Sequence, residues 1–316
     1  MSKDLKMNLR LGSRGSPLAL VQANFVAAAI QKKFPDVTVN IVTIQTSGDK
    51  FKGERLADAG GKALFVKEIE EALLKETIDF AVHSLKDLPG DIPEELTLAA
   101  FPKREDSRDC FVSLQFKSFD ALPKGSVVGT TSPRREVQIA TLRPDLQVKP
   151  IRGNIDTRLK KMEAGSYDAI ILAVAGLKRL GKQEIIRQYF DPSFFIPAVG
   201  QGILGIETKK NRSDLIRCLR EALNDLETEF AGKAERAFLK TMGGDCFTPL
   251  GAYARVEGGN VKLLGWLGNP DGTKNIRMEK RAPVDQVKKL GVSMAQDILE
   301  RGGKEILDAI ASHPRA

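Results

Sequence analysis

Residues 12–22 read GSRGSPLALVQ, and residues 129–138 read GTTSPRREVQ. Each stretch leads from a strand-like run through glycine and a hydroxyl residue to Ser-Pro, where serine can cap a helix and proline suits its first position. A helix start exposes unpaired N–H groups and therefore attracts anions. Ser-Pro is also simply a good helix start, but the adjacent arginines (Arg14 in one copy, Arg134 and Arg135 in the other) favour two anion sites.

The surrounding sequence extends this pattern into two α/β regions. Strand-like runs near residues 9–12, 37–46, 78–85 and 96–101 alternate with helical spacing at 17–34 and 65–76, and residues 126–182 alternate in the same way. Such alternation predicts largely parallel sheets. The run FFIPAVGQGILGIE at 194–207 is interpreted as chain that re-enters a core after a crossing.

The last third predicts a different architecture. An amphipathic helix at 224–242 leads to the turn MGGDCFTPLG, followed by strands joined by glycine-containing turns and a closing helix at about 284–311. This order predicts a small α+β domain with an antiparallel sheet.

Composition limits the class of protein. A length of 316 residues predicts two or three domains, and 42% apolar with 28% charged residues is typical of a soluble globular protein. We identify no membrane-spanning run and no secretory signal, so we expect a cytoplasmic protein. Three separated cysteines and only two histidines fit neither a disulfide framework nor a metal site.

The positive charge is concentrated in one region. Residues 124–182 contain 12 Lys or Arg against 5 Asp or Glu, out of a net charge of +8 for the chain. This excess indicates an anionic partner. Nucleic acid is disfavoured because aromatic residues make up only 6% of the chain and do not alternate with the basic ones.

Two groups of residues are candidates for chemistry. Lys86 and Asp87 follow a buried strand directly, at the strand end where ligands of α/β sheets bind. An exposed ion pair in a loop is the alternative. The second group consists of arginines near strand ends and helix starts, which suit a polycarboxylate ligand because guanidinium groups bind carboxylates through two hydrogen bonds; a solvated basic face is the alternative. These arginines are Arg134, Arg135, Arg152, Arg158 and Arg179.

Nearly the whole chain resembles the porphobilinogen deaminase (hydroxymethylbilane synthase) family of tetrapyrrole biosynthesis. The resemblance is carried by GSRGSPLALVQA, GGKALFVKEIEEALL, DFAVHSLKDLP, REDSRDCFV, VVGTTSPRR, PIRGNIDTRLKKMEAGSYDAIILAVAGLKRLG, PAVGQGILGIE and GGDCFTPLGAYA, all in one order. It implies a transferase that joins four porphobilinogen molecules, with loss of four ammonia molecules, into the linear tetrapyrrole hydroxymethylbilane for porphyrin and haem synthesis.

The resemblance also implies three domains. Two lobes similar to periplasmic binding proteins, with mixed and mostly parallel sheets, would comprise residues 1–102 plus 202–222 and residues 103–201. Residues 223–316 would form the C-terminal α+β domain, which carries a cysteine that holds a dipyrromethane cofactor through a thioether. By motif position that residue is Cys246, and the catalytic carboxylate is Asp87. We expect a monomer.

The remaining site residues implied by the motifs would bind carboxylates of cofactor and substrate. They are Arg14, Ser16, Lys62, Ser84, Lys86, Thr130, Ser132, Arg134, Arg135, Arg152, Arg158 and Arg179, with Lys62 in a loop that can cover the cleft. Three departures from the family pattern are Asp58 where a lysine is frequent, the order Asp245-Cys246 in the cysteine turn, and Pro133 where leucine is frequent. None removes a catalytic group.

Two alternatives belong to other classes. A non-enzymatic two-lobed anion-binding protein would leave the cysteine turn and the third domain without a role, and a nucleic-acid binder would not explain Asp87 beside so many arginines. Both alternatives predict an unmodified Cys246. No histidine stands near this thiol to activate it, so we interpret Cys246 as a tether rather than a nucleophile.

Overall fold

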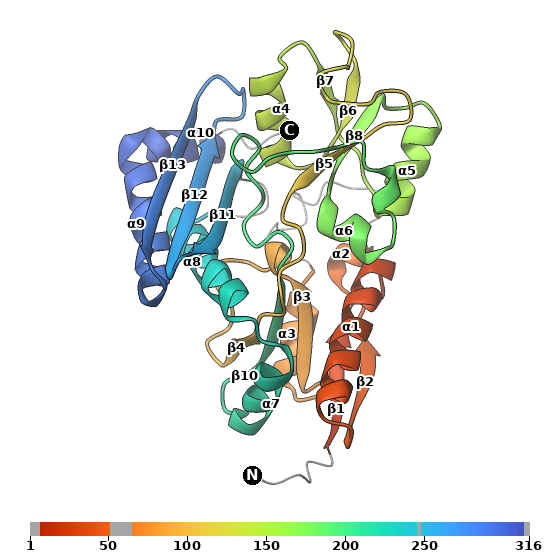
Figure 1. Cartoon of the computed structure of the whole chain (residues 1–316), viewed down its shortest axis with the longest axis vertical. Coiled ribbons are helices and arrows are strands. Elements are labelled where there is room, and N and C mark those ends of the chain that lie inside the picture. Colours follow the sequence, from red (N-terminus) through yellow and green to blue (C-terminus); the bar gives the residue numbers. More distant parts are fainter. Residues whose placement is uncertain (1–6, 51–64, 245–247, 313–316) are drawn as a thin grey trace. The chain divides into compact units, whose positions relative to one another are not determined.

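The computed structural model describes residues 7–50, 65–244 and 248–312, which belong to two compact units (Figure 1). Unit 1 comprises residues 1–105 and 203–232, and unit 2 comprises residues 106–202 and 233–316. The last passage of the chain from unit 1 to unit 2 falls inside helix α8 (Leu226–Met242). The three-domain division remains a prediction.

A five-stranded mixed sheet forms the centre of unit 1, in the order β2-β1-β3-β10-β4. Its strands are β1 (Met7–Ser13), β2 (Val37–Thr43), β3 (Phe80–Ser84), β4 (Leu96–Ala100) and β10 (Leu204–Lys209). β1 pairs in parallel with β2 and β3, whereas β10 runs antiparallel to both β3 and β4. All strands except β10 therefore share one direction, which confirms the prediction of a mixed, mostly parallel sheet.

Helices cover both faces of this sheet because successive strand residues point to opposite faces. The helical elements are α1 (Pro17–Lys33), α2 (Ser47–Lys50), α3 (Lys67–Leu74), the 3₁₀ turn η1 (Leu85–Asp87) and α7 (Ser213–Leu223). Phe80 and Val82 join a core with α1 and α7, whereas Ala81 joins a core with α3. The re-entry of the chain predicted at 194–207 is confirmed by β10, which completes this sheet.

Unit 2 contains a second five-stranded sheet with the same pattern of strand directions, in the order β7-β6-β8-β5-β9. Its strands are β5 (Asp109–Val112), β6 (Val127–Gly129), β7 (Gln147–Lys149), β8 (Ala169–Ala173) and β9 (Gln188–Tyr189). β6 is parallel to β7 and β8, and β5 runs antiparallel to β8 and β9. The helical elements beside it are α4 (Pro133–Leu142), α5 (Ile155–Glu163), α6 (Val174–Arg179) and the 3₁₀ turn η2 (Gln183–Ile185).

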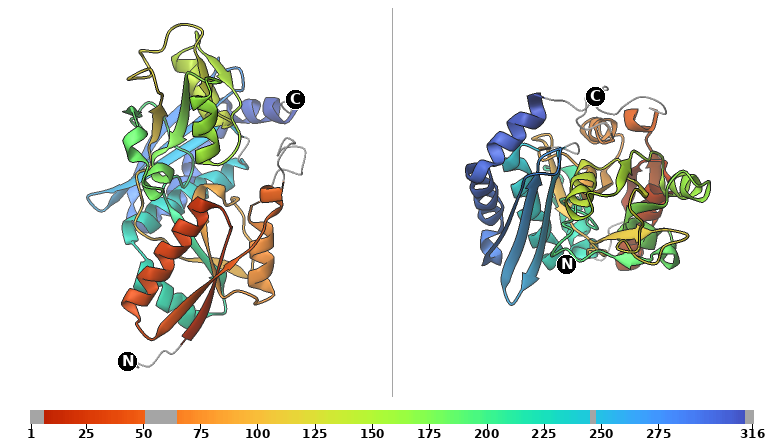
Figure 2. Two further views of the ribbon diagram at one scale, coloured as in Figure 1. Left: turned by 90° about the vertical axis from the view of Figure 1, so that its right-hand side faces the viewer. Right: turned by 90° about the horizontal axis from the view of Figure 1, so that it is seen from above.

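The remainder of unit 2 contains a three-stranded antiparallel sheet, as predicted (Figure 2). Its elements are β11 (Leu250–Glu257), β12 (Asn260–Gly268), β13 (Asn275–Pro283), the 3₁₀ turn η3 (Val284–Gln286), α9 (Val287–Ile298), the π-helical turn η4 (Leu299–Gly303) and α10 (Lys304–Ser312). The predicted single closing helix is wrong, because Gly302 has a φ of +99° and breaks it between α9 and α10. On β12, Trp266 packs against Val137 of α4 and Ile196.

Among the residues that the structure describes, no helix is both long enough and apolar enough to span a membrane.

Candidate active site

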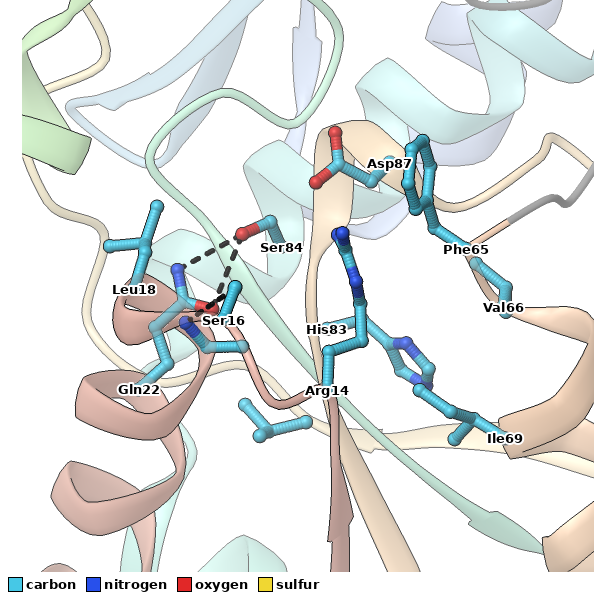
Figure 3. A pocket seen from close by; sticks show the side chains of 12 residues that line it. Arg14, Ser16, Leu18, Gln22, Phe65, Val66, Ile69, His83, Ser84 and Asp87 are labelled. Carbon is cyan, nitrogen blue, oxygen red and sulfur yellow. Dashed lines mark hydrogen bonds between the residues drawn. The ribbon is translucent and has the colours of Figure 1, made fainter. Parts of the chain in front are cut away.

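A cavity of about 60 Å³ lies in unit 1 where β1 and β3 end (Figure 3). These two strands are parallel, so the loops that follow them meet at one edge of the sheet, together with the start of α1. The lining residues are Arg14, Ser16, Leu18, Ala19, Gln22, Phe65, Val66, Ile69, Val82, His83, Ser84 and Asp87. The structure thus brings together four predicted site residues, Arg14, Ser16, Ser84 and Asp87.

Asp87 is placed by the apolar residues on either side of it. β3 ends at Ser84, and the turn η1 that follows is anchored by Leu85 and Leu88, each only 1% exposed. The backbone N–H of Leu85 also donates to Ile203 O at 2.9 Å. Within the described part of the chain, the Asp87 carboxylate makes no hydrogen bond or ion pair. A fixed carboxylate with free oxygens is suited to bind a cation or to accept a proton.

The two serines of the cavity have different partners. Ser16 caps α1 as predicted, because its Oγ accepts from the backbone N–H of Ala19 at 3.3 Å. Ser84 Oγ accepts from the side-chain amide of Gln22 at 3.0 Å. The sequence analysis did not single out Gln22, although it lies in the matched stretch GSRGSPLALVQA, two turns into the helix that Ser16 begins. Its burial in the cavity wall makes it a further candidate for ligand contact.

Arg14 is held on two sides. Its Nε and Nη2 donate to Asp49 Oδ2 and Oδ1 at 3.3 and 2.5 Å, and its guanidinium carbon lies 4.2 Å from the centre of the Phe65 ring. Thr46 Oγ1 donates to Asp49 Oδ2 at 2.7 Å. Burial acts to raise the pKa of Asp49, but the hydrogen bonds from Arg14 and Thr46 outweigh it, so this pKa lies below its usual range.

His83, which lines the cavity, forms a buried pair with Glu207 of β10. His83 Nε2 lies 3.0 Å from Glu207 Oε2, and the two side chains are 4% and 0% exposed. His83 stands opposite Gly205 in the β3–β10 ladder, while Glu207 is two residues farther along β10 on the same face. The pair links the strand that positions Asp87 to its neighbour in the sheet.

In unit 2, Arg134 and Arg135 surround one buried carboxylate that the sequence analysis missed. Asp109 Oδ1 accepts from Arg135 Nε and Nη2 at 3.1 and 2.7 Å, and Arg134 Nη2 lies 2.7 Å from Asp109 Oδ2. Gln201 Nε2 donates to the same carboxylate at 3.0 Å. Burial acts to raise the pKa of Asp109, but the two guanidinium charges lower it to about 2.

Topology explains this cluster. Asp109 begins β5 opposite Ala173, the last residue of β8, so it lies at the edge where the parallel strands β6 and β8 end. α4, which carries both arginines, starts at the same edge after β6. Pro133 opens α4 as predicted, but Ser132 makes no side-chain cap; its N–H donates to Thr130 Oγ1 at 3.1 Å.

Arg158 is a cation without an acidic partner among the described residues. It lies on α5, and its Nε donates to Gly153 O at 2.9 Å. Burial and the charge of Arg135 lower the pKa of Arg158 to about 10. Arg158 thus adds a third positive charge beside Arg135, which already shares the single carboxylate of Asp109 with Arg134.

The other predicted residues lie nearby or outside the described residues. Arg152 is exposed in the turn between β7 and α5, and Arg179 at the end of α6 donates to Gly202 O at 2.8 Å. Lys86 is half-buried in η1 beside Asp87. Lys62 and Cys246 lie outside the described residues. Among the residues that are described, no group of three or more His, Cys, Asp or Glu side chains could hold a metal ion.

The arginine-rich edge of unit 2 fits a cofactor with several carboxylates. Its guanidinium groups outnumber its carboxylate, and Arg134 Nε is buried without a hydrogen-bond partner in the described structure. A carboxylate ligand would supply both the missing charge and an acceptor. The residues therefore fit the acetate and propionate groups of a dipyrromethane.

These features define the class: an α/β protein with an arginine-rich edge in one sheet and, at the edge of another, a carboxylate without a partner among the described residues. Residues 9–217 match the family model described as porphobilinogen deaminase, dipyromethane cofactor binding domain, and residues 230–300 match porphobilinogen deaminase, C-terminal domain. The chain belongs to the porphobilinogen deaminase family.

A curated relative and several solved structures are similar to the chain. The porphobilinogen deaminase of Alkaliphilus metalliredigens (strain QYMF) is 44% identical over 307 residues, which cover 97% of each chain. The methionine binding protein MetQ has a TM-score of 0.45 and 13% identity, covering 68% of this chain and 89% of its own. The periplasmic VFT2 domain of Bordetella pertussis BvgS has a TM-score of 0.40 and 15% identity, covering 74% and 92%.

Proposed function

We propose that this chain is a hydroxymethylbilane synthase, a transferase that joins four porphobilinogen molecules with loss of four ammonia molecules to give hydroxymethylbilane. Membership of the porphobilinogen deaminase family supports this activity. The structural observation that carries it is the Asp87 carboxylate, fixed at a strand end without a protein partner among the described residues, in a cavity that also contains Arg14. An anion-binding protein would have no need of this free carboxylate.

Asp87 acts on the positive charge and the proton of the reaction. When the aminomethyl carbon–nitrogen bond of porphobilinogen breaks, ammonia leaves and the substrate carbon becomes cationic. An ionised Asp87 offsets that charge, because a preorganised carboxylate costs no reorganisation as the charge develops. After the pyrrole carbon of the growing chain has attacked, Asp87 accepts the proton that this carbon must lose.

The cationic residues near Asp87 hold substrate carboxylates. Arg14 presents guanidinium N–H groups to the cavity, with the hydroxyls of Ser16 and Ser84 beside it and Lys86 in the adjacent turn. Acetate and propionate groups bound there would fix the pyrrole ring relative to Asp87. Lys62, which lies outside the described residues, completes the proposed set.

Unit 2 holds the cofactor in this proposal. Dipyrromethane, when bound through Cys246, supplies the pyrrole carbon to which the first substrate unit is joined. The guanidinium groups of unit 2 bind its carboxylates and keep its rings in place. The residues proposed for this role are Thr130, Ser132, Arg134, Arg135, Arg152, Arg158 and Arg179.

We propose further that residues 223–316 act as a separate cofactor-bearing domain, and that the enzyme is a cytoplasmic monomer without nucleic-acid or membrane partners. The charge excess is explained by carboxylates of cofactor and substrate, and so requires no nucleic acid.

The intact mass of the purified protein tests the proposal. Protein made in cells that supply porphobilinogen should exceed its sequence mass by two linked pyrrole units, and Cys246→Ser should lose this excess. Folded protein without the excess contradicts the proposal and favours the anion-binding alternative.

Asp87→Asn tests the catalytic assignment separately. This variant should fold and turn over at least about 10²-fold more slowly. Asp36→Asn is the control, because Asp36 is exposed and precedes β2 at the opposite edge of the sheet. Near-normal ammonia release by Asp87→Asn would remove Asp87 from its role.

A further inference from the structure

One edge of the Arg14 guanidinium is occupied within the protein. A guanidinium has five N–H donors, one on Nε and two on each terminal nitrogen. Asp49 accepts from Nε and from one N–H of Nη2, while Phe65 covers one face of the group. In the described structure Nη1 has no hydrogen-bond partner. The edge formed by Nη1 and the second Nη2 N–H is therefore available for a bidentate carboxylate.

This available edge belongs to the proposed substrate cavity. Arg14 and Asp87 both line the cavity, and Figure 3 shows the Arg14 side chain directed towards Asp87. The Arg14 guanidinium therefore contacts Asp49 through its Nε and Nη2 atoms, and its remaining edge faces the space in which a substrate carboxylate would bind.

Asp49 is itself held firmly. Thr46, which is fully buried, donates to Asp49 Oδ2 through its hydroxyl, and the backbone N–H of Asp49 donates to Thr46 O at 3.0 Å. The adjacent Ser47 donates its backbone N–H to Glu68 Oε1 at 2.8 Å, which ties α2 to α3. The carboxylate therefore stands at a position set by two helices rather than by Arg14.

We propose that Asp49 is a positioning residue that orients Arg14 for the substrate carboxylate. The inference rests on the proposed function, because it takes Arg14 to bind porphobilinogen. A long arginine side chain has many rotamers, and binding of a planar carboxylate through two hydrogen bonds requires one of them. Asp49 selects that rotamer without occupying the ligand edge. It is separate from the residues that the family motifs assign to ligand binding.

The principal test compares steady-state kinetics of Asp49→Asn, Arg14→Gln and the double variant. Asp49→Asn should raise the KM for porphobilinogen about 10-fold with kcat within about two-fold of the wild type. Arg14→Gln should raise KM at least as much. Because Asp49 acts through Arg14, adding Asp49→Asn to Arg14→Gln should change KM no further.

Two more variants distinguish the effect of the position of the Asp49 carboxylate from the effect of its charge and from a nonspecific effect of breaking an ion pair. Asp49→Glu keeps the charge but moves the carboxylate by one methylene, so positioning predicts a raised KM and a pure charge effect predicts the wild-type value. Asp145→Asn is the matched control, because Arg143 also bonds Asp145 through Nε and Nη2, at 2.7 Å each, and both pairs are partly exposed. This control should leave KM unchanged.

Four results would overturn the inference. A lower KM in Asp49→Asn would show that Asp49 competes with substrate, and an equal effect of Asp49→Asn with and without Arg14 would show that it acts elsewhere. A normal KM in Asp49→Asn beside a raised KM in Arg14→Gln refutes the inference alone, whereas a normal KM in Arg14→Gln also refutes the proposed role of Arg14.

Discussion

Replacement of Asp109 by asparagine tests the electrostatics of the unit 2 arginines. Asparagine retains the shape of the side chain and some of its hydrogen bonds, but in a Cys246→Ser background, which cannot carry the proposed cofactor, it leaves Arg134 and Arg135 buried without a carboxylate. Asp109 is fully buried, so solvent cannot compensate. We expect the variant to unfold more readily because two like charges then remain in a medium of low dielectric constant.

Two estimates give the size of the expected loss in the free energy of unfolding. Removing one partner of a buried ion pair typically costs about 3–5 kcal/mol of the free energy of unfolding. The pKa of Asp109 falls from its ordinary value of 3.8 to about 2, which corresponds to about 2 kcal/mol in favour of the ionised form. We therefore expect Asp109→Asn to destabilise unit 2 by about 2–5 kcal/mol and to lower its melting temperature by about 4–20 °C.

The chain contains a natural reporter for this measurement. Trp266 is its only tryptophan, is 5% exposed and packs against Val137, on the same helix as Arg134 and Arg135. Urea unfolding of the full chain followed by tryptophan fluorescence thus reports on unit 2. Asp145→Asn, in the partly exposed pair with Arg143, is the control and should shift the midpoint much less. Equal midpoints for the two variants would refute the reasoning.

Three further predictions concern acid unfolding, Arg158 and Gly291. Because the pKa of Asp109 is depressed in the folded state, the ionised carboxylate contributes its full stabilisation above about pH 4 and loses it as the pH falls towards 2. Acid unfolding, followed by Trp266 fluorescence, should therefore depend less steeply on pH in Asp109→Asn over that interval. An unchanged slope would contradict this. Arg158→Met should reduce cofactor loading measured by intact mass, because it removes a guanidinium that has no acidic partner among the described residues; normal loading would exclude Arg158 from the cofactor site. Gly291→Ala should destabilise unit 2 by about 1–3 kcal/mol in the same urea assay, because an added Cβ would collide with Ala234 O and the Ala237 side chain of α8. A wild-type midpoint would show that α8 and α9 can move apart at no cost in stability.

Local features of the site could be predicted from the sequence, whereas its long-range partners could not. Neighbouring residues predict that helices begin after Ser16 and Ser132 and that a turn carries Asp87. The structure places these elements as expected. Asp49 lies 35 residues from Arg14, and Asp109 lies 26 residues from Arg135. Nothing in a short window distinguishes these carboxylates from exposed ones, because their partners are set by strand order.

The closing helix shows the same limit on a smaller scale. Its apolar spacing continues across residues 284–311, so periodicity predicts one helix, but the Gly302-Gly303 pair permits a left-handed residue within η4 that separates α9 from α10. The catalytic assignments of Asp87 and Cys246 came from the resemblance to a family rather than from spacing, and they remain predictions.

The antiparallel strand of each five-stranded sheet has a consequence for synthesis on the ribosome. Once residue 189 has emerged, every strand of the β7-β6-β8-β5-β9 sheet is present. The sheet of unit 1 still lacks β10 (Leu204–Lys209), which must insert between β3 and β4, so both strands expose an unpaired edge until then. Such edges invite association with other chains. The N-terminal unit is therefore the later of the two to complete its sheet, and the edges of β3 and β4 stay unpaired until residue 209 has emerged from the ribosome.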